Sequence, residues 1–210
     1  MSKRTADIGT LDRFCHEDRA MADGYLNVAG IDEAGRGPLA GPVSASAVII
    51  KDRVFTARID DSKRLTAKNR ERAFVEIIEK CDVGIGTASV EEIDKLNIYN
   101  ATLLAMKRAI GDLNTRPDFL LIDGNMKMPG GFPQLALVSG ETYSFSIACA
   151  SIIAKVYRDR IMMDEDGKYP EYGFKNHKGY GTKEHLENIR KHGLSHIHRK
   201  TFGPFGSHRT

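Results

Sequence analysis

Acidic side chains follow two apolar segments of this 210-residue sequence, at places where solvated acids are not expected. Asp32 and Glu33 come directly after the run 25–31, and Asp123 follows the wholly apolar run 119–122. An Asp before a glycine is also ordinary turn chemistry, so Asp123 taken alone has a structural explanation. Together these carboxylates indicate a site, because ligands of α/β sheets collect beyond the carboxyl ends of the strands.

A fourth carboxylate, Asp159, lies on the apolar side of a predicted helix. Ile152 and Val156 precede it and Met163 follows it at helical spacing, which places all four side chains on one stripe. Burying a charge there is costly unless the charge is paired or bound to a metal ion. An ion pair with Lys155, one turn earlier, or with a neighbouring arginine is the structural alternative.

Four carboxylates without a cysteine cluster favour a cation that prefers oxygen ligands. No histidine lies between positions 17 and 176, so Mg²⁺ or Mn²⁺ is expected rather than Zn²⁺. Two such ions, about 4 Å apart, can activate a water and stabilise the leaving oxygen of an in-line displacement at phosphorus. The set therefore predicts phosphodiester hydrolysis. Neighbouring strand residues point to opposite faces, so Asp32 and Glu33 both reach the site only if the strand stops or twists between them.

Two glycines and an arginine follow the first acidic pair. Gly35, Arg36 and Gly37 match neither a dinucleotide-binding loop nor a P-loop, because Pro38 and Pro42 prevent a helix from following. Glycines let the backbone approach a ligand closely and hydrogen-bond a hydroxyl directly. The 2′-hydroxyl distinguishes RNA from DNA, so this loop is a candidate ribose sensor. A tight turn between two strands is the alternative.

The elements that must position these residues follow from hydrophobic periodicity and from glycine and proline breaks. We expect strands over 25–31, 43–50, 83–89, 119–122 and 135–138. Helices are expected over 11–21, from the N-cap Thr66 to about 80, over 90–113 as one helix or two, and over 144–163. This order predicts an α/β fold in which helices flank a mixed five-stranded sheet.

Composition and charge limit the class of protein. Apolar residues make up 41% of the chain and charged residues 28%, which excludes collagen-like, disordered and disulfide-rich classes. The longest apolar stretch, 43–50, is far shorter than the roughly 20 residues that cross a bilayer, and residues 1–10 lack the apolar core of a signal peptide. We therefore expect a cytoplasmic protein.

The net charge of +3 conceals an asymmetry. Residues 175–210 carry eight Lys and Arg against two Glu, or +6, which leaves 23 basic against 26 acidic residues, or −3, for residues 1–174. A basic segment on an acidic body indicates a polyanionic partner, although a solvated tail is the alternative. Six of the seven histidines also lie in this segment, and we interpret them as a solvated or phosphate-facing surface.

Several ordered blocks closely resemble the ribonuclease HII family, the type 2 ribonucleases H of prokaryotes. The blocks are 29–43, 61–63, 100–102 with 105–106, 122–124, 150–159 with Met162, and 179–185. The similarity covers about residues 25–204. It implies a ribonuclease H-like fold with an added C-terminal helical extension.

The resemblance also implies a role for individual residues. The catalytic carboxylates, which bind Mg²⁺ or Mn²⁺ as two ions during catalysis, are implied to be Asp32, Glu33, Asp123 and Asp159. The loop that senses the 2′-hydroxyl is implied to be Gly35, Arg36 and Gly37. Tyr180 is implied to stack on the sugar of the next deoxynucleotide. Phosphate or active-site polar contacts are implied for Ser62, Lys63 and Lys155.

The implied activity is that of an endoribonuclease. It hydrolyses the RNA strand of RNA/DNA hybrids and incises duplex DNA 5′ to embedded ribonucleotides, leaving 3′-hydroxyl and 5′-phosphate ends. Residues 1–172 would form the catalytic domain, with 1–24 as a helical lead-in, and 173–210 a basic helical extension that brings Tyr180 into the site. We expect a monomer whose partner is nucleic acid and not a membrane.

One departure from the family pattern precedes the long helix. The family usually has Lys-Gly-Asp where this chain has Ser139, Gly140 and Glu141, so a basic substrate contact is expected to be missing. Ribonuclease HIII relatives typically have Gly-Lys-Gly in the loop and a further N-terminal domain, so Arg36 favours type HII. The alternatives are a ribonuclease HIII-like hybrid nuclease, a non-catalytic nucleic-acid-binding protein of the same fold, and another two-metal phosphotransferase.

Overall fold

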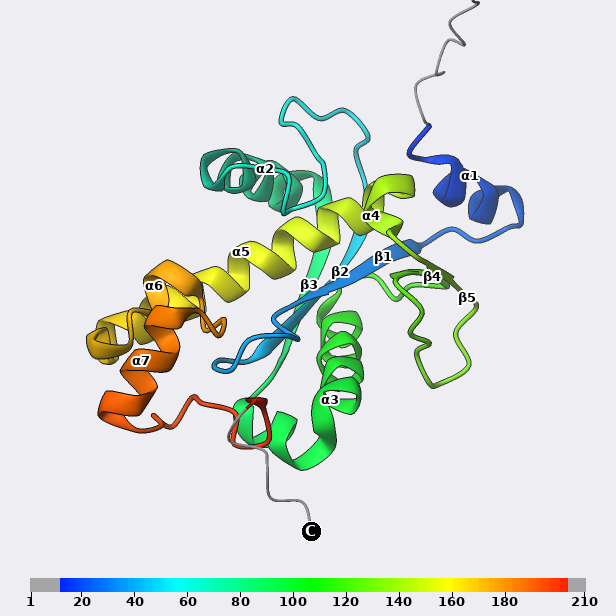
Figure 1. The fold of residues 1–210 in the computed structure, drawn as a ribbon. Helices are drawn as coiled ribbons and strands as arrows, with labels where there is room; N and C mark the ends of the chain where they lie inside the picture. The colour runs from blue at the N-terminus through cyan, green and yellow to red at the C-terminus, as the bar shows by residue number, and fades with distance from the viewer. Residues whose placement is uncertain (1–11, 204–210) are drawn as a thin grey trace, which may run out of the picture.

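The computed structural model describes residues 12–203 and has a mixed five-stranded sheet at its centre (Figure 1). The strands are β1 (Val28–Ala34), β2 (Val43–Ile50), β3 (Cys81–Ala88), β4 (Phe119–Asp123) and β5 (Gln134–Leu137). Their spatial order is β3-β2-β1-β4-β5. The first three strands pair antiparallel, whereas β4 runs parallel to both β1 and β5. The predicted fold class is confirmed.

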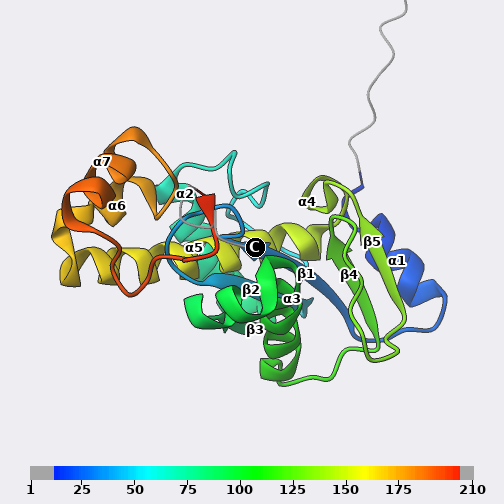
Figure 2. The ribbon, with the colours of Figure 1, turned by 60° about the horizontal axis from the view of Figure 1, so that its bottom comes forward.

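Helices cover both faces of this sheet (Figure 2). They are α1 (Cys15–Ala22), α2 (Ala67–Lys80), α3 (Val90–Asp112), α4 (Gly140–Tyr143), α5 (Phe145–Lys168), the 3₁₀ helix η1 (Pro170–Tyr172), α6 (Phe174–His177) and α7 (Lys183–His192). The predicted helix over 11–21 corresponds to α1, and residue 11 lies outside the described residues. No helix within 12–203 is long and apolar enough to cross a membrane.

Two hydrophobic cores fix the central strands. Successive strand residues point to opposite faces, so one core forms under α3 and the other under α5 and α2. Ile31 and Ile122 pack with Met106 in the first core, and Val48 packs with Ile152 in the second. Each of these side chains is fully buried and contributes about 2 kcal/mol to folding. The ends of β1 and β4 are therefore held rigidly.

The junction between α4 and α5 lies directly against β1. Ser144 caps α5, because its Oγ accepts a hydrogen bond from the Ile147 N–H at 3.2 Å. Gly30 permits the close approach, since a Cβ there would lie 2.2 Å from the carbonyl carbon of Ser146. The buried Glu17 of α1 accepts hydrogen bonds from the hydroxyls of Ser144 and Ser146 at 2.6 and 2.7 Å. These contacts place α4 beside the carboxyl end of the sheet.

The C-terminal helices pack on the far end of α5 and on the loop that follows β1 (Figure 2). Leu39 of that loop forms a cluster with Phe174 of α6, Ile189 of α7 and Ile197 beyond it. The Leu39 N–H donates to the carbonyl oxygen of Gly179 at 2.8 Å. Over its described part, the predicted extension is therefore joined to the loop that contains the glycines.

Candidate active site

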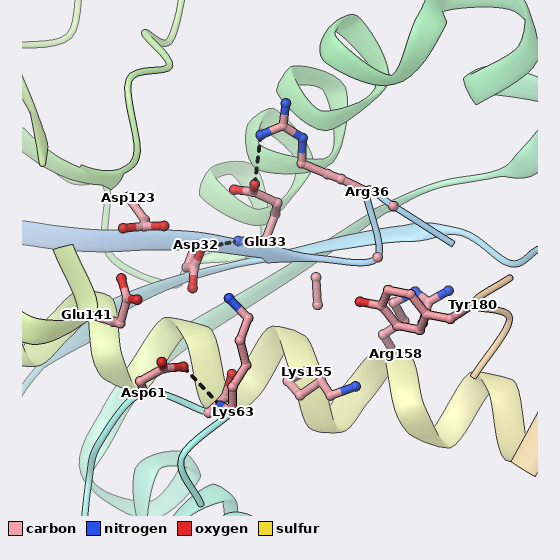
Figure 3. Close-up of a pocket in the computed structure, with 14 residues that line it drawn as sticks. Asp32, Glu33, Arg36, Asp61, Lys63, Asp123, Glu141, Lys155, Arg158 and Tyr180 are labelled. Carbon is pink, nitrogen blue, oxygen red and sulfur yellow. Dashed lines mark hydrogen bonds and ion pairs between the residues drawn. The ribbon is translucent and has the colours of Figure 1, made fainter. Parts of the chain in front are cut away.

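A pocket of about 310 Å³ opens at the carboxyl ends of β1 and β4 (Figure 3). Nearly all the residues predicted for the site line it, namely Asp32, Glu33, Gly35, Arg36, Gly37, Ser62, Lys63, Asp123, Lys155 and Tyr180. Three charged residues that the sequence did not place there line it as well: Asp61, Glu141 and Arg158. Asp159 is the only predicted site residue that does not line this pocket.

Parallel strands hold Asp32 and Asp123 side by side. The residues before them pair in register between β1 and β4, so the two carboxylates follow at the same edge. The Glu33 N–H donates to Oδ1 of Asp32, and the Gly140 N–H donates to Oδ1 of Asp123, each at 2.7 Å. A Cβ at Gly140 would lie 2.7 Å from the Ile147 side chain, so a larger residue would disturb this contact. Backbone donors thus fix both carboxylates.

Glu33 leaves the strand in a different direction from Asp32. Of the two conditions considered, a stop or a twist between these residues, the stop is absent, because β1 continues through Ala34. Figure 3 shows Asp32 on the side of Glu141, whereas Glu33 turns toward Arg36. Oε1 of Glu33 accepts from Nη1 of Arg36 at 3.1 Å, and Oε2 is buried and has no hydrogen-bond partner among residues 12–203. Burial raises the pKa of Glu33, although the charge of Arg36 opposes this rise.

Glu141, at the start of α4, faces Asp32 and Asp123 (Figure 3). Burial and the neighbouring Asp123 raise the pKa of Glu141. Burial and the charges of Glu33 and Asp123 raise the pKa of Asp32 well above its usual range. Acids that repel one another in a buried pocket take up protons more readily, and a bound cation would relieve the same repulsion. Sequence reasoning could have found Glu141 from the family pattern, because Glu141 stands where the family usually has an aspartate.

Asp159 lies farther along α5 and lines a different cavity. Its Oδ1 accepts from Nζ of Lys155 at 2.7 Å, which is the ion pair considered as the structural alternative. The apolar stripe that suggested burial does not extend to Met163, whose side chain is 57% exposed. The structure thus brings Glu141, and not Asp159, to the other three carboxylates.

A cation faces the carboxylates from the loop before α2. Figure 3 shows the Lys63 side chain reaching into the pocket toward Asp32 and Glu141. Its loop is held in place by Oδ1 of Asp61, which accepts from the Lys63 N–H at 2.9 Å. The carbonyl oxygen of the buried Ser62 accepts from Nη1 of Arg70 at 2.7 Å. The Lys63 ammonium therefore adds a positive charge to the acidic pocket.

Two buried arginines hold the loop that contains the glycines, and neither pairs with a carboxylate among the described residues. Their guanidinium groups donate to backbone carbonyls, Arg158 to those of Ala40, Pro42 and Lys178, and Arg199 to those of Gly35, Arg36 and Gly41. Gly35 has a φ of +94°, and a Cβ there would lie 2.0 Å from Nε of Arg158, so only glycine fits. Burial and the charge of Arg158 lower the pKa of Arg199 to about 9.

Buried histidines support the loop that carries Tyr180. The Ser195 N–H donates to Nδ1 of His198 at 2.9 Å, so neutral His198 carries its proton on Nε2, which lies 3.0 Å from Nε2 of His185. His185 then donates from Nδ1 to the carbonyl oxygen of Tyr180 at 2.9 Å. Burial and the neighbouring His185 lower the pKa of His198 to about 4, in keeping with a neutral chain.

The solvated surface expected of the histidines is therefore wrong for three of them. His177, His185 and His198 are all buried, and His177 stacks on His185 with the ring centroids 4.3 Å apart. His208 lies outside the described residues.

The acidic pocket fits a divalent cation that prefers oxygen ligands. Oε2 of Glu33 and Oε2 of Glu141 are buried and have no hydrogen-bond partners in the described part of the chain, and Asp32 and Asp123 add further oxygen ligands. As the side chains stand, no group of three His, Cys, Asp or Glu within 12–203 is arranged to hold a metal ion. Mg²⁺ and Mn²⁺ suit an open site of this kind, because Mg²⁺ in particular retains several water ligands.

The family profile and the similar sequences all indicate the same family. The profile described as Ribonuclease HII matches residues 29–204. The chain is 53% identical over 188 residues to a ribonuclease HII from Clostridioides difficile, which covers 89% of this chain and 73% of that relative. It is 50% identical over 189 residues to a ribonuclease HII from Caldicellulosiruptor bescii, covering 89% and 91%.

Solved structures match the fold as well. Ribonuclease H2 from Pyrococcus horikoshii superposes with a TM-score of 0.73 at 25% identity, covering 86% of this chain and 96% of that chain. The ribonuclease HII in a complex with PCNA from Archaeoglobus fulgidus gives a TM-score of 0.71 at 26% identity, covering 85% and 96%. A ribonuclease HIII solved in complex with Mn²⁺ shares the fold, with a TM-score of 0.61 at 20% identity, covering 91% and 69%.

Proposed function

The chain belongs to the ribonuclease HII family of metal-dependent endoribonucleases, and from this premise we propose how its pocket cleaves RNA. The proposed cleavage lies 5′ to a ribonucleotide, in an RNA/DNA hybrid or within duplex DNA, and leaves 3′-hydroxyl and 5′-phosphate ends. The observation that carries the proposal is the convergence of Asp32, Asp123 and Glu141, with Glu33 beside them, next to the loop that contains the glycines.

We propose that these four carboxylates hold two Mg²⁺ or Mn²⁺ ions. Bound there, the ions would activate the attacking water and stabilise the leaving 3′-oxygen. Asp32 and Asp123 present their free oxygens rigidly, because a backbone N–H already fixes the other oxygen of each carboxylate. Lys63 would contact a non-bridging oxygen of the scissile phosphate, and the buried Ser62 would hold the Lys63 loop in place.

The choice of ribose over deoxyribose is proposed to rest on the loop at Gly35, Arg36 and Gly37. The carbonyl oxygens of Gly35 and Arg36 already accept hydrogen bonds from Arg199. A 2′-hydroxyl would therefore meet the backbone amides of the loop and the carbonyl of Gly37. Tyr180, 46% exposed, lines the same pocket and offers its ring to the next sugar. Lys155 would contact a neighbouring phosphate, and one chain supplies every residue, so a monomer suffices.

Cleavage of a DNA duplex with one embedded ribonucleotide tests this function. We expect Asp123→Asn to lose at least about 100-fold in rate with either Mg²⁺ or Mn²⁺, while it still binds the duplex. Asp164→Asn is the matched control, because Asp164 is exposed on α5 outside the pocket, and it should retain full activity. Turnover by Asp123→Asn at the wild-type rate would contradict the proposed mechanism.

The same assay separates the other classes. A two-metal DNA nuclease would also cut an all-DNA duplex, and a non-catalytic binding protein would cut neither duplex. We expect incision at the ribonucleotide alone.

A further inference from the structure

A second cavity, of about 390 Å³, lies between the start of α2, the middle of α5 and the end of α6. Its charged lining has four cations and two acids, which are Arg70, Lys155, Arg160, Lys178, Glu71 and Asp159. The formal charge of this lining is therefore +2. Lys155 lines both this cavity and the active-site pocket, so the two are neighbours.

The two acids of the cavity are already paired. Asp159 accepts from Lys155, and Glu71 accepts from Arg160. Arg70 and Lys178 have no carboxylate partner among the described residues. Nη1 of Arg70 donates to two backbone carbonyls, which fix its guanidinium against the loop at 62–65. The surplus positive charge of the cavity therefore lies on these two side chains.

Lys178 is placed by the backbone and not by an ion pair. It ends α6 in a left-handed conformation with a φ of 50°, and within 12–203 its ammonium donates only to the carbonyl of Lys175. Burial lowers the pKa of Lys178, and the charges of Lys155 and Arg158 lower it further against the effect of Asp159. A partly buried ammonium among like charges is stabilised by a bound anion.

The N-terminus of α2 adds to the positive electrostatic potential of the cavity. Ala67, its first residue, lines the cavity, and the first turn of this 14-residue helix contains no acidic side chain. The partial positive charge at the helix N-terminus is therefore not neutralised within the helix. Four cations and this helix end surround one concave surface, which indicates an anionic ligand.

We propose that this cavity binds a backbone phosphate of the nucleic acid, about two to four nucleotides beyond the phosphate proposed to contact Lys155, an inference that rests on the proposed function. The helix α5 rises about 1.5 Å per residue, so the cavity residues 159–163 lie about 6–12 Å beyond Lys155. One strand of a duplex advances about 3.4 Å per nucleotide, so a distance of about 6–12 Å corresponds to about two to four nucleotides. The cavity thus extends the substrate path along α5.

Two substitutions of opposite sign test the proposal on the full chain, with binding to the ribonucleotide-containing duplex measured in EDTA. Lys178→Gln removes a cation and should weaken binding about three- to tenfold, with a loss of about 0.9 from the slope of log K against log salt. Glu71→Gln releases Arg160 from its partner and should tighten binding. A folding defect would not produce this increase.

Lys107→Gln is the matched control, because Lys107 is exposed on α3, which packs on the other face of the sheet. Equal effects of Lys107→Gln and Lys178→Gln, or wild-type affinity in both Lys178→Gln and Glu71→Gln, would overturn the proposal.

Duplexes with one neutral methylphosphonate, scanned along both strands, locate the contact. At one position a few nucleotides from the ribonucleotide, the effect of Lys178→Gln should disappear. An effect that persists at every position would refute a discrete phosphate site. If the proposed function itself fails, the wild-type protein does not incise at the ribonucleotide, and this outcome is independent of these affinities.

Discussion

At the scale of single residues, the position of each carboxylate in the pocket is set by the strand or helix to which it belongs. Asp32 lies near the end of β1 and Asp123 ends the neighbouring parallel strand β4; both accept backbone N–H groups, so their positions follow from the sheet. Glu141 comes instead from the first turn of the four-residue helix α4. From there its side chain faces Asp32 and Asp123, at the position where the family usually has aspartate.

A pair of substitutions distinguishes the two candidates for the fourth carboxylate. We expect Glu141→Gln to reduce the cleavage rate about 100-fold or more, because it removes a charge from the acidic pocket. Asp159→Asn should change the rate less than about fivefold, because it removes only an ion pair worth up to about 1 kcal/mol. Rates for both variants on the ribonucleotide-containing duplex decide the matter, and the opposite order would restore the role first predicted for Asp159.

The sequence predicts the pocket residues that follow an apolar strand. It does not predict the residues whose place in the pocket depends on tertiary packing. Asp32 and Asp123 were identified because each follows an apolar strand. Asp159 was selected by helical spacing, which assumes that the stripe is buried, whereas Met163 is exposed. Arg158 and Arg199 are buried through hydrogen bonds to carbonyls of a distant loop, and nothing local in the sequence indicates that.

At the scale of elements, local signals predicted the strands and the capped helices well. Thr66 caps α2 as predicted, and Ser144, expected as the first residue of a helix, is the N-cap of α5. The segment 90–113, expected as one helix or two, is a helix with a kink at Asn97, whose φ is 66°. The short helices η1 and α6 were not predicted, because single turns carry no periodicity and depend on tertiary contacts.

The histidine chain behind Tyr180 predicts a dependence of stability on pH. The pKa of His198 is about 4 in the folded protein and about 6.5 in the unfolded chain. Between these values the unfolded chain binds a proton that the folded protein does not, so the free energy of unfolding falls as the pH drops from 6.5 to 4. The loss is up to about 3 kcal/mol and is absent above pH 6.5.

Urea denaturation at several pH values, followed by far-UV circular dichroism, measures this loss. His198→Gln keeps a donor toward His185 but does not titrate, so its stability should vary less with pH than that of the wild type. His192→Gln, at an exposed position on α7, is the control and should follow the wild-type curve. Parallel curves for His198→Gln and the wild type would contradict this assignment.

At the scale of the whole molecule, the basic C-terminal segment has two separate roles. Arg199 and His198 are fully buried and hold loops of the site, whereas Lys183, Arg190 and Lys191 are exposed on α7. The charge asymmetry of the sequence therefore does not describe one continuous surface. Part of the positive charge is internal to the fold, and only the exposed part is available to a polyanion.

We expect the chain to unfold in a single cooperative transition despite its predicted division at residue 172. Buried contacts between the loop at 35–42 and the segment 195–199 should make the two parts unfold together. Urea unfolding followed by circular dichroism and by tyrosine fluorescence tests this, since the chain has seven tyrosines and no tryptophan. Two transitions at different urea concentrations would show that the extension unfolds independently.

The hydrogen bond between Arg199 and Gly35 joins residues 164 positions apart. A ribosome synthesises the chain from its N-terminus, so Gly35 is made long before Arg199. The loop proposed to recognise ribose can gain this support only after residue 199 has been synthesised. A chain truncated before residue 195 would retain the acids of the strands but would lack the donor that holds the carbonyl oxygen of Gly35.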